Sequence, residues 1–366
     1  MQFIKGLTRK KQSSSSASAE TRKKEHDYYL ENGSAVLEEL LALCDGNCRI
    51  PIRYFTATDI ERAIKHSENK LYIADGHMVT GSLDKRLVFI RTFPGYFRNH
   101  FNNIFRDIAI TAQMSHLKNV LRLVGCCIEF EEPVMVYEYV EATSLYALLF
   151  EKDNHDDETR KSLLSWGSRL RIAHKVASAV VFLHTEFTTP IIHRDLKPSN
   201  VIVDQNSGVA KLLNFSLSVS LPQGKLEVVK DVVCGTYGYV APEYSEWCMI
   251  TQKIDVYSFG VILLQLLTRR NMTTLHLKDR DMYYIVDPSD SDFKMLNIEE
   301  IHVMDIADPA ILEEHGIKIR QQLEDCWDLV KKCTAYKGEE RPYMIEVAKE
   351  LSRIHHCFRA LTLCRN

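Results

Sequence analysis

The feature that most constrains the fold is a series of four short motifs in the second half of the chain. They are HRDLKPSN (His193–Asn200), GTYGYVAPE (Gly235–Glu243), DVYSFG (Asp255–Gly260) and, farther along, Arg341. One short motif can recur by chance, but four in one order and at set separations indicate a shared architecture. A further segment, LLNFSLS (Leu212–Ser218), lies between the first two. The fold must bring all of these segments to defined places.

Length, charge and cysteine content limit the class of protein. A chain of 366 residues can bury a large core, and either one two-lobed domain or two ordinary domains would fit. The formal net charge of -3 provides no field that would attract nucleic acid. The 10 cysteines include no C-x-x-C pair, which favours reduced thiols in a cytoplasmic protein. No apolar run reaches the roughly 18 residues that a spanning helix needs, so we expect a soluble protein.

The N-terminal segment differs in composition from the rest of the chain. Residues 1–27 are basic and rich in serine, and their small apolar content predicts a flexible tail that could touch an anionic membrane surface. Order is expected from Tyr28, in a helical extension over residues 28–70. Ser34 is a predicted helix N-cap and Gly46 a stop signal. The resulting amphipathic helix either pads the adjoining domain or docks a partner.

The pattern from residue 56 to residue 140 mixes helices and strands. A capped helix is predicted over Thr56–Ile64, and β-prone runs follow between Leu71 and Ile90. Residues 104–117 have helical apolar spacing, and Pro133–Val140 is another candidate strand. The expected order is strands, one helix, then more strands.

The chain beyond Val140 is expected to be mainly helical. Ser165–His184 places its apolar residues on one helix face, and Gln252–Thr268 is so apolar that it predicts a buried helix. The polar segment Glu151–Ser162 is predicted to be a solvated loop.

Taken together, the motifs resemble those of the protein kinase fold, over about residues 55 to 355. The resemblance implies an α+β fold with a small β-rich N-lobe (residues 71–140) and a larger helical C-lobe (residues 141–355), followed by a C-terminal tail (residues 356–366). Stretches such as LVGCCIE, MVYEYV and GTYGYVAPEY are similar to the plant receptor-like kinases.

The segments that would bind nucleotide depart from the kinase pattern. Of the three glycines expected above the phosphates, the alignment retains only Gly76, with Leu71 and Ile73 at the other two positions, so the phosphate cradle is predicted to be lost. Arg91 stands where a lysine is expected to bind phosphates. Asp107 stands where its glutamate partner is expected, and a bidentate pair between the two would preserve the lobe geometry.

The predicted metal site departs most from the kinase pattern. Asn214 replaces an aspartate that would give a full negative charge to Mg²⁺, and an amide oxygen offers only a dipole. Ser216, at a position where glycine is usual, restricts the backbone further. Asn200 would be the ligand of a second metal ion by resemblance, so Asn200 and Asn214 together predict a weak metal site if any. No cofactor is expected to be required, and weak binding of ATP and Mg²⁺ stays open.

The catalytic loop, in contrast, is complete. By resemblance Asp195 would accept the substrate hydroxyl proton and Lys197 would stabilise the transferred phosphoryl group. Other matching residues are structural in the family. These are His193, Arg194, Glu243, Asp255 and Arg341. Retention of such residues is expected whether or not the chain is an enzyme.

A closer resemblance is to the ZED-related kinases, a group of plant receptor-like cytoplasmic kinases that includes pseudokinases. It implies an adaptor in innate immunity that is bound to a coiled-coil nucleotide-binding leucine-rich-repeat receptor. Such an adaptor recognises a bacterial effector, or a related receptor-like cytoplasmic kinase that an effector has modified. The expected location is the cytoplasm, with recruitment to the plasma membrane through the complex, and no nucleic acid is involved. The receptor contact is assigned to the helix over Ser34–Leu43 and the small lobe.

The activation segment, Asn214–Glu243, is the expected sensor surface, because such segments change order when local charge changes. Its hydroxyls could be modified by an effector, or could be ordinary loop residues. They belong to Ser216, Ser218, Ser220, Thr236 and Tyr237. Two alternatives to the adaptor stay open: a weakly active ATP-dependent serine/threonine kinase, and a bait whose activation segment mimics an effector's targets.

Overall fold

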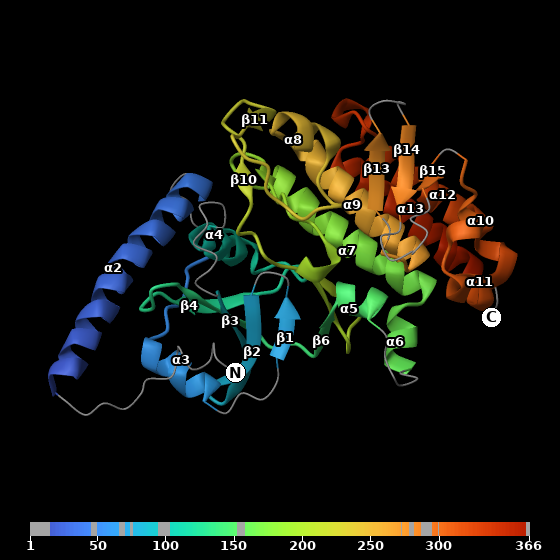
Figure 1. Ribbon diagram of the computed structural model, residues 1–366. Coiled ribbons are helices and arrows are strands. Elements are labelled where there is room, and N and C mark those ends of the chain that lie inside the picture. Colours follow the sequence, from blue (N-terminus) through green and yellow to red (C-terminus); the bar gives the residue numbers. More distant parts are fainter. Residues whose placement is uncertain are drawn as a thin grey trace. The chain divides into compact units, whose positions relative to one another are not determined.

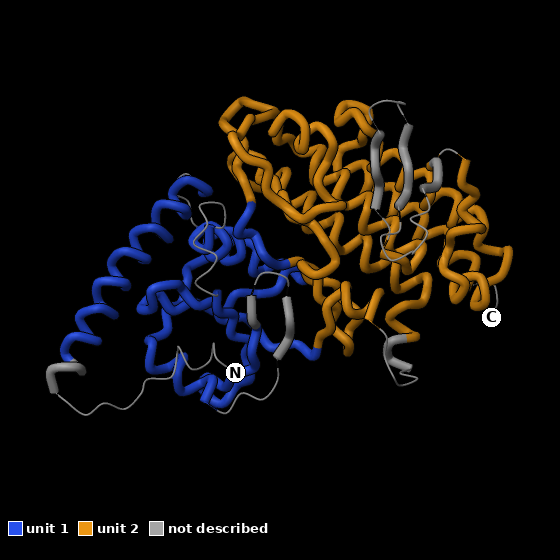
Figure 2. Tube along the Cα trace, viewed as in Figure 1, with its two compact units in different colours: residues 1–141, 213–217 blue, residues 142–212, 218–366 orange. Residues whose placement is uncertain are grey.

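The structure is a computed structural model that describes residues 15–44, 50–65, 70–73, 76–93, 103–151, 158–271, 273–277, 282–286, 295–298 and 300–363. The chain divides into two units (Figure 2). Unit 1 comprises residues 1–141 and 213–217, and unit 2 comprises residues 142–212 and 218–366. The short return of residues 213–217 to unit 1 places Asn214 and Ser216 in that unit.

Unit 1 is built on one antiparallel sheet of five strands in the order β1-β2-β3-β5-β4 (Figure 1). The strands are β1 (Lys70–Ile73), β2 (Gly76–Leu83), β3 (Arg86–Thr92), β4 (Leu123–Cys127) and β5 (Val134–Glu138). The helices are α2 (Ser15–Cys44), α3 (Ala57–Ile64) and α4 (Ile104–Met114). The capping box at Thr56 starts α3, as its sequence predicts, and Ile60 and Ile64 pack with Val79 and Ile90 in the sheet core.

Helix α2 begins earlier than the sequence predicts. It is helical from Ser15, so the expectation of a flexible tail through residue 27 and of an N-cap at Ser34 is wrong. Contacts with residues distant in sequence hold its middle against the rest of unit 1. The Asn32 amide donates to the carbonyl oxygens of Ile128 and Phe130 at 3.0 and 2.8 Å, and Val36 is fully buried. Residues 1–14 and the predicted stop at Gly46 lie outside the described residues.

Unit 2 is mainly helical, as expected, with small sheets at its edges (Figure 1). Its α-helices are α5 (Leu145–Phe150), α6 (Glu158–Leu163), α7 (Trp166–Thr185), α8 (Pro242–Trp247), α9 (Gln252–Thr268), α10 (Val303–Ile306), α11 (Pro309–His315), α12 (Arg320–Cys333) and α13 (Met344–Leu363). The prediction of a buried helix is confirmed, because every residue of α9 from Ile254 to Thr268 is buried. Helix α9 packs against α7 and α12, and α7 packs against α13.

The short strands of unit 2 place loops around the helices. One sheet has β6 (Ala142–Ser144), β8 (Val201–Asp204) and β9 (Ala210–Leu212), and another has β13 (Thr273–Leu277), β14 (Met282–Val286) and β15 (Met295–Asn297). Two pairs are β7 (Ile191–Ile192) with β10 (Val219–Ser220), and β11 (Glu227–Val229) with β12 (Met249–Thr251).

The predicted loop over residues 151–162 is partly wrong, because it contains the start of α6. Helix α6 contacts α7, and its last residue, Leu163, is buried together with Leu164, so the segment is anchored at its C-terminal end. Residues 152–157 lie outside the described residues.

Candidate functional site

Strands β1 and β2 form the hairpin that would lie over a nucleotide. Their pairing runs up to Ile73 opposite Gly76, so Gly76 is a strand residue and only two residues separate the strands. The glycine-rich motif of kinases, G-x-G-x-x-G, is longer than this connection. The two connecting residues lie outside the described residues, and the loss of the cradle stays a prediction.

Arg91 on β3 lies at the centre of a buried polar cluster in unit 1. Its side chain is 0% exposed, and its guanidinium lies 4.6 Å from the centre of the Phe93 ring. One terminal nitrogen donates to Asp107 Oδ2 at 3.0 Å, and the other donates to Asn214 Oδ1 at 3.0 Å. The guanidinium therefore divides between two partners and does not form the bidentate pair with Asp107 that the sequence suggested.

Asp107 in the first turn of α4 has both carboxylate oxygens engaged. Oδ2 accepts from Arg91, and Oδ1 accepts from the Thr111 hydroxyl and from the backbone N–H of Phe215, each at 3.0 Å. The bond to Phe215 ties the returning segment to α4, as does a bond from Asn103 N to the Ser216 carbonyl at 2.8 Å. Asp107 thus satisfies a buried cation and positions the segment that carries Asn214.

Asn214 adopts a left-handed backbone conformation with φ 69°. Asparagine tolerates this region better than most residues. Its amide oxygen accepts from Arg91 and from the Ser216 hydroxyl, each at 3.0 Å. An sp² oxygen has two lone pairs, and both are in use here. A metal ion at this oxygen would have to displace a buried guanidinium, so these residues do not fit Mg²⁺.

Tyr137 on β5 is a further buried neighbour of this cluster. Its hydroxyl donates to the Met135 sulfur at 3.2 Å. Burial, and secondarily the negative charge of Asp107, hold the pKa of Tyr137 well above its usual range. Tyr137 therefore stays neutral and adds no charge near Arg91.

The catalytic loop belongs to unit 2 and is ordered by its own hydrogen bonds. The Asp195 carboxylate contacts Lys197 Nζ at 2.9 Å and accepts from the Thr236 hydroxyl at 2.6 Å. Lys197 also donates to Thr236 at 2.7 Å, which closes a triangle of three side chains. Asn200 donates to the Asp195 carboxylate at 3.0 Å and to its carbonyl at 2.8 Å. The structure thus brings Asp195, Lys197 and Asn200 together.

Asp255 in the first turn of α9 holds the backbone of this loop through hydrogen bonds. Its carboxylate accepts from the backbone N–H groups of His193 and Arg194 at 2.8 and 2.9 Å, and contacts His184 Nε2 at 2.9 Å. Arg194 has φ 70°, a conformation that needs support from its surroundings. The contacts of Asp255 provide that support and are those of a structural residue.

Glu243 and Arg341 form a nearly buried ion pair. Both terminal nitrogens of Arg341 contact the Glu243 carboxylate at 2.7 Å, and the remaining donors bond backbone carbonyls, including those of Ala335 and Tyr336. A pair with its donors satisfied in this way is costly to break from one side. It ties the end of the activation segment to the loop before α13.

The hydroxyls of the activation segment differ in access. Ser216 and Ser218 are buried, Ser220 is half-buried, and Thr236 is engaged with the catalytic loop. Tyr237 is 88% exposed. Of the five predicted hydroxyls, Tyr237 is therefore the one that another protein can reach without rearrangement.

Two contacts of the site were not foreseen from the sequence. The sequence predicts Thr236 only as a modifiable hydroxyl, whereas in the structure it bonds Asp195. The sequence also gives no role to Thr111, although its position one helical turn after Asp107 on α4 places it within reach. The spacing to Thr111 was a usable signal, whereas the contact with Thr236 depends on the fold.

Comparison with known proteins defines the class. A family model described as "Protein kinase domain" matches residues 84–351. The chain therefore belongs to the protein kinase family, and the expected two-lobed α+β kinase fold is confirmed.

Similar proteins place the chain in one group within the protein kinase family. "Serine/threonine-protein kinase ZRK1" of Arabidopsis thaliana is 34% identical over 349 residues, which cover 93% of this chain and 96% of that protein. "Non-functional pseudokinase ZED1" of the same plant is 34% identical over 341 residues, which cover 92% and 98%. The chain thus belongs to the ZED-related kinases, as its motifs suggested. One of these relatives is named a kinase and the other a non-functional pseudokinase, so their names do not decide whether this chain is catalytic. Within the described part of the chain, no helix is long and apolar enough to cross a bilayer.

Proposed function

We propose that this chain is a pseudokinase adaptor in plant innate immunity. It links recognition of a bacterial effector, or of an effector-modified receptor-like cytoplasmic kinase, to a coiled-coil nucleotide-binding leucine-rich-repeat receptor. In this role the kinase fold supplies surfaces and needs no bound nucleotide. The resemblance to the ZED-related group supports the partners, and the buried cluster of unit 1 supports the absence of catalysis.

The observation that carries the proposal is the double use of the Asn214 amide oxygen. Mg²⁺ is bound by oxygen ligands, mainly carboxylates. At Asn214 the charge is missing, and the oxygen already accepts from Ser216 and from the cation of Arg91. A divalent ion there would meet a like charge in a buried site, where Coulomb repulsion is weakly screened. Loss of one preorganised electrostatic contact costs about a hundred- to a thousand-fold in rate.

The receptor contact is assigned to the exposed side of α2. Leu30, Leu37 and Leu41 are exposed and lie on one face, since they are seven and four residues apart. The other side of the helix is attached to unit 1 through Asn32 and Glu39, whose carboxylate contacts Arg106 at 2.8 Å. The row of leucines lies on a helix whose opposite side is held by these contacts, so it offers a rigid apolar surface to a receptor.

The sensor is assigned to the activation segment around Tyr237. Val229 and Val232 in the same segment are also exposed. Arg194 lies near the Tyr244 ring, and the Tyr244 hydroxyl accepts from Cys234 N at 2.8 Å, which anchors the segment's base. A modified partner can therefore reorder the exposed part of the segment around Tyr237 without disturbing the core, because the contact between Cys234 and Tyr244 anchors the segment.

The first test is nucleotide binding and γ-phosphate transfer by the full chain, with Mg²⁺ or Mn²⁺. We expect no metal-dependent thermal shift with ATP, and equal background transfer in the unsubstituted chain and in Asp195→Ala. As a matched variant, Asn214→Asp restores a carboxylate and is expected to gain a metal-dependent shift. Transfer that is lost in Asp195→Ala would overturn the proposal.

The second test concerns the receptor. Leu37→Glu with Leu41→Glu is expected to abolish co-purification with the leucine-rich repeats of the receptor, because it puts charges into the apolar row. Ile317→Glu changes an exposed residue of unit 2 and should leave binding unchanged. Equal binding by both variants would place the receptor contact elsewhere.

A weakly active serine/threonine kinase is the second candidate function. The observation in its favour is the closed triangle of Asp195, Lys197 and Thr236, which is the part of the site that accepts a substrate hydroxyl. The comparison with Asp195→Ala separates it from the adaptor, because a slow enzyme loses its signal in that variant.

A further inference from the structure

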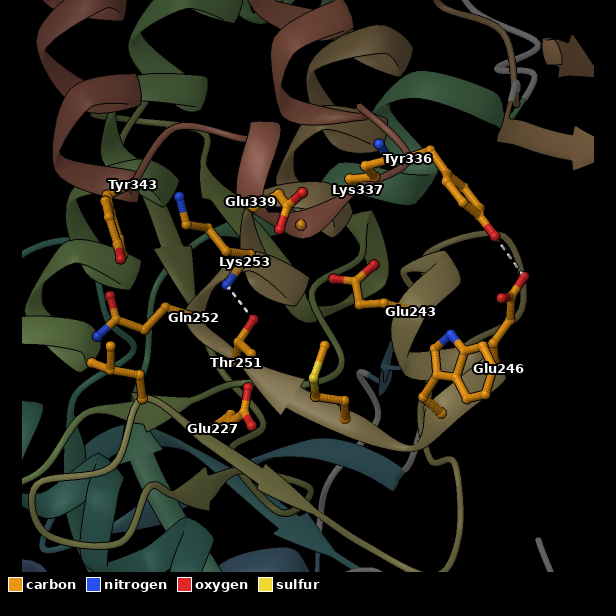
Figure 3. A pocket seen from close by; sticks show the side chains of 14 residues that line it. Glu227, Glu243, Glu246, Thr251, Gln252, Lys253, Tyr336, Lys337, Glu339 and Tyr343 are labelled. Carbon is orange, nitrogen blue, oxygen red and sulfur yellow. Dashed lines mark hydrogen bonds between the residues drawn. The ribbon is translucent and has the colours of Figure 1, made fainter. Parts of the chain in front are cut away.

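A cavity of about 410 Å³ lies within unit 2. It is bounded by the paired strands β11 and β12, by α8, by the start of α9 and by the loop before α13 (Figure 3). Of the residues predicted for nucleotide, metal and catalysis or as structural residues, only Glu243 lines it. Its volume lies at the lower end of the range for ligand sites, which suits a side chain better than a nucleotide.

Aromatic side chains form part of the wall. Tyr343 and Tyr336 lie on opposite sides of the cavity (Figure 3). Trp247 at the end of α8 also lines it and is 69% exposed, which is costly for the largest apolar side chain. The cavity already accommodates one cation against a ring, since Lys253 Nζ lies 3.7 Å from the centre of the Tyr343 ring. Its walls therefore suit cation–π contact.

The residues that line the cavity include more acidic than basic side chains. Four glutamates line the cavity, at positions 227, 243, 246 and 339, against two lysines, at positions 253 and 337. Arg341 neutralises Glu243. Lys253 is engaged with the Arg341 carbonyl, and Lys337 lies 3.8 Å from Glu340. The Glu246 carboxylate accepts from the Tyr336 hydroxyl at 3.0 Å.

Glu227 and Glu339 are the carboxylates best placed for a ligand. Both are exposed, and neither has an ion-pair partner among the residues that the structure describes. They come from opposite parts of the cavity lining, β11 and the loop before α13. A cation between them would contact carboxylates and aromatic faces together.

We propose that this cavity binds an arginine or lysine side chain presented by an extended basic segment of a partner protein. Carboxylates on two sides supply charge complementarity, and the indole of Trp247 supplies an aromatic face. The site is separate from the nucleotide question, so it does not depend on whether the chain transfers phosphate.

The pair of strands beside the cavity favours a protein segment over a small cation as the ligand. Strands β11 and β12 form a sheet of two strands, so within the described residues each keeps an outer edge. An extended peptide can add to such an edge through backbone hydrogen bonds, with alternate side chains entering a pocket. Leu226 and Val229 flank this edge and are exposed, which gives the segment apolar contacts beside the cation.

The chain carries its own probe for this site. It has 3 tryptophans, and Trp166 and Trp327 are buried, so acrylamide quenching of fluorescence reports mainly on Trp247. The probe ligand is a blocked peptide of alternating arginine and threonine. Its control has citrulline in place of arginine, which keeps the shape without the charge. We expect the arginine peptide to protect Trp247 from quenching and the citrulline peptide to give no protection.

Substitutions separate the proposed site from general attraction. Glu227→Gln with Glu339→Gln should weaken peptide binding about fivefold, the effect of two exposed charges. Glu313→Gln with Glu324→Gln removes two carboxylates elsewhere in unit 2, of which Glu313 is exposed and Glu324 is half-buried and paired with Arg320, and should leave binding unchanged. Equal protection by the citrulline peptide, or undiminished binding by the Glu227 and Glu339 variant, would overturn the proposal. Protection that rises with protein concentration in the absence of peptide would also overturn it, because the occupant would be a second copy.

Discussion

The buried contact between Arg91 and Asp107 can be tested by a double-mutant cycle. Both side chains are 0% exposed and lie 3.0 Å apart. Removing one partner of such a pair costs about 3–5 kcal/mol, because the other charge stays buried without compensation. We therefore expect Arg91→Met to destabilise the chain by about this amount, and Asp107→Asn to be costly for the same reason.

The double variant should cost less than the sum of the single variants. With both charges removed, the amide oxygen that Asp107→Asn introduces can still accept from Thr111 and from the Phe215 N–H, which bond Asp107 Oδ1 in the unsubstituted chain. The main remaining losses are the guanidinium's bond to Asn214, about 1 kcal/mol, and some packing. The coupling energy between the two sites should therefore be at least about 3 kcal/mol, the upper end of the range for residues in contact.

The assay is urea unfolding of the full chain followed by circular dichroism, with hydrogen exchange of β3 and α4 to localise the effect. Arg122 and Glu138 supply a matched control pair in the same unit, 3.1 Å apart but with the arginine side chain 55% exposed. Its coupling should stay below about 1 kcal/mol. If the costs at Arg91 and Asp107 added within about 0.5 kcal/mol, the buried bridge would not be a fixed unit, and the adaptor proposal would lose its main support.

Three further predictions concern the folded chain. Asn32→Ala should cost about 2 kcal/mol through the loss of two hydrogen bonds and should speed hydrogen exchange in α2, whereas unchanged exchange would contradict the docking of that helix. Gly260→Ala would place a Cβ 2.7 Å from the Cys333 Cβ, so we expect a cost of about 1–3 kcal/mol and a lower Tm. Burial raises the pKa of the Cys126, Cys127 and Cys333 thiols to about 12. The thiols of the unfolded chain lose their protons at lower pH than the buried thiols of the folded chain. The contribution of these thiols to stability is therefore complete below about pH 8.5 and should fall as the pH rises towards 12. Midpoints of urea unfolding measured across this range should fall, and constant midpoints would refute the prediction.

The sequence predicted the regular elements well where the signal was local. The capping box at Thr56 and the apolar character of Gln252–Thr268 were sufficient for α3 and α9. The start of α2 at Ser15 was not predictable in this way, because the capping signal favours Ser34. The contact that docks the helix joins Asn32 to a residue 96 positions later, which no local pattern reveals.

The sequence identified the individual residues of the candidate site, but it did not predict the contacts between them. Comparison with the kinase pattern identified Arg91, Asp107 and Asn214 as departures, and each by itself reads as a defect. Their relation depends on a hydrogen bond between residues 123 positions apart, which no local pattern reveals. The same holds for Thr236 and Asp195, which are 41 positions apart.

The three departures in unit 1 compensate one another electrostatically. The kinase pattern has one lysine, one glutamate and one aspartate at these positions, a set with an excess of one negative charge that a bound metal can balance. Here Arg91 and Asp107 balance, and Asn214 adds no charge, so the buried set is neutral without a metal. The longer arginine also reaches the amide oxygen that a metal would otherwise contact. Random decay of an active site would leave buried charges unpaired, at a cost in stability. The neutral, hydrogen-bonded cluster instead keeps its charges balanced without a bound metal ion.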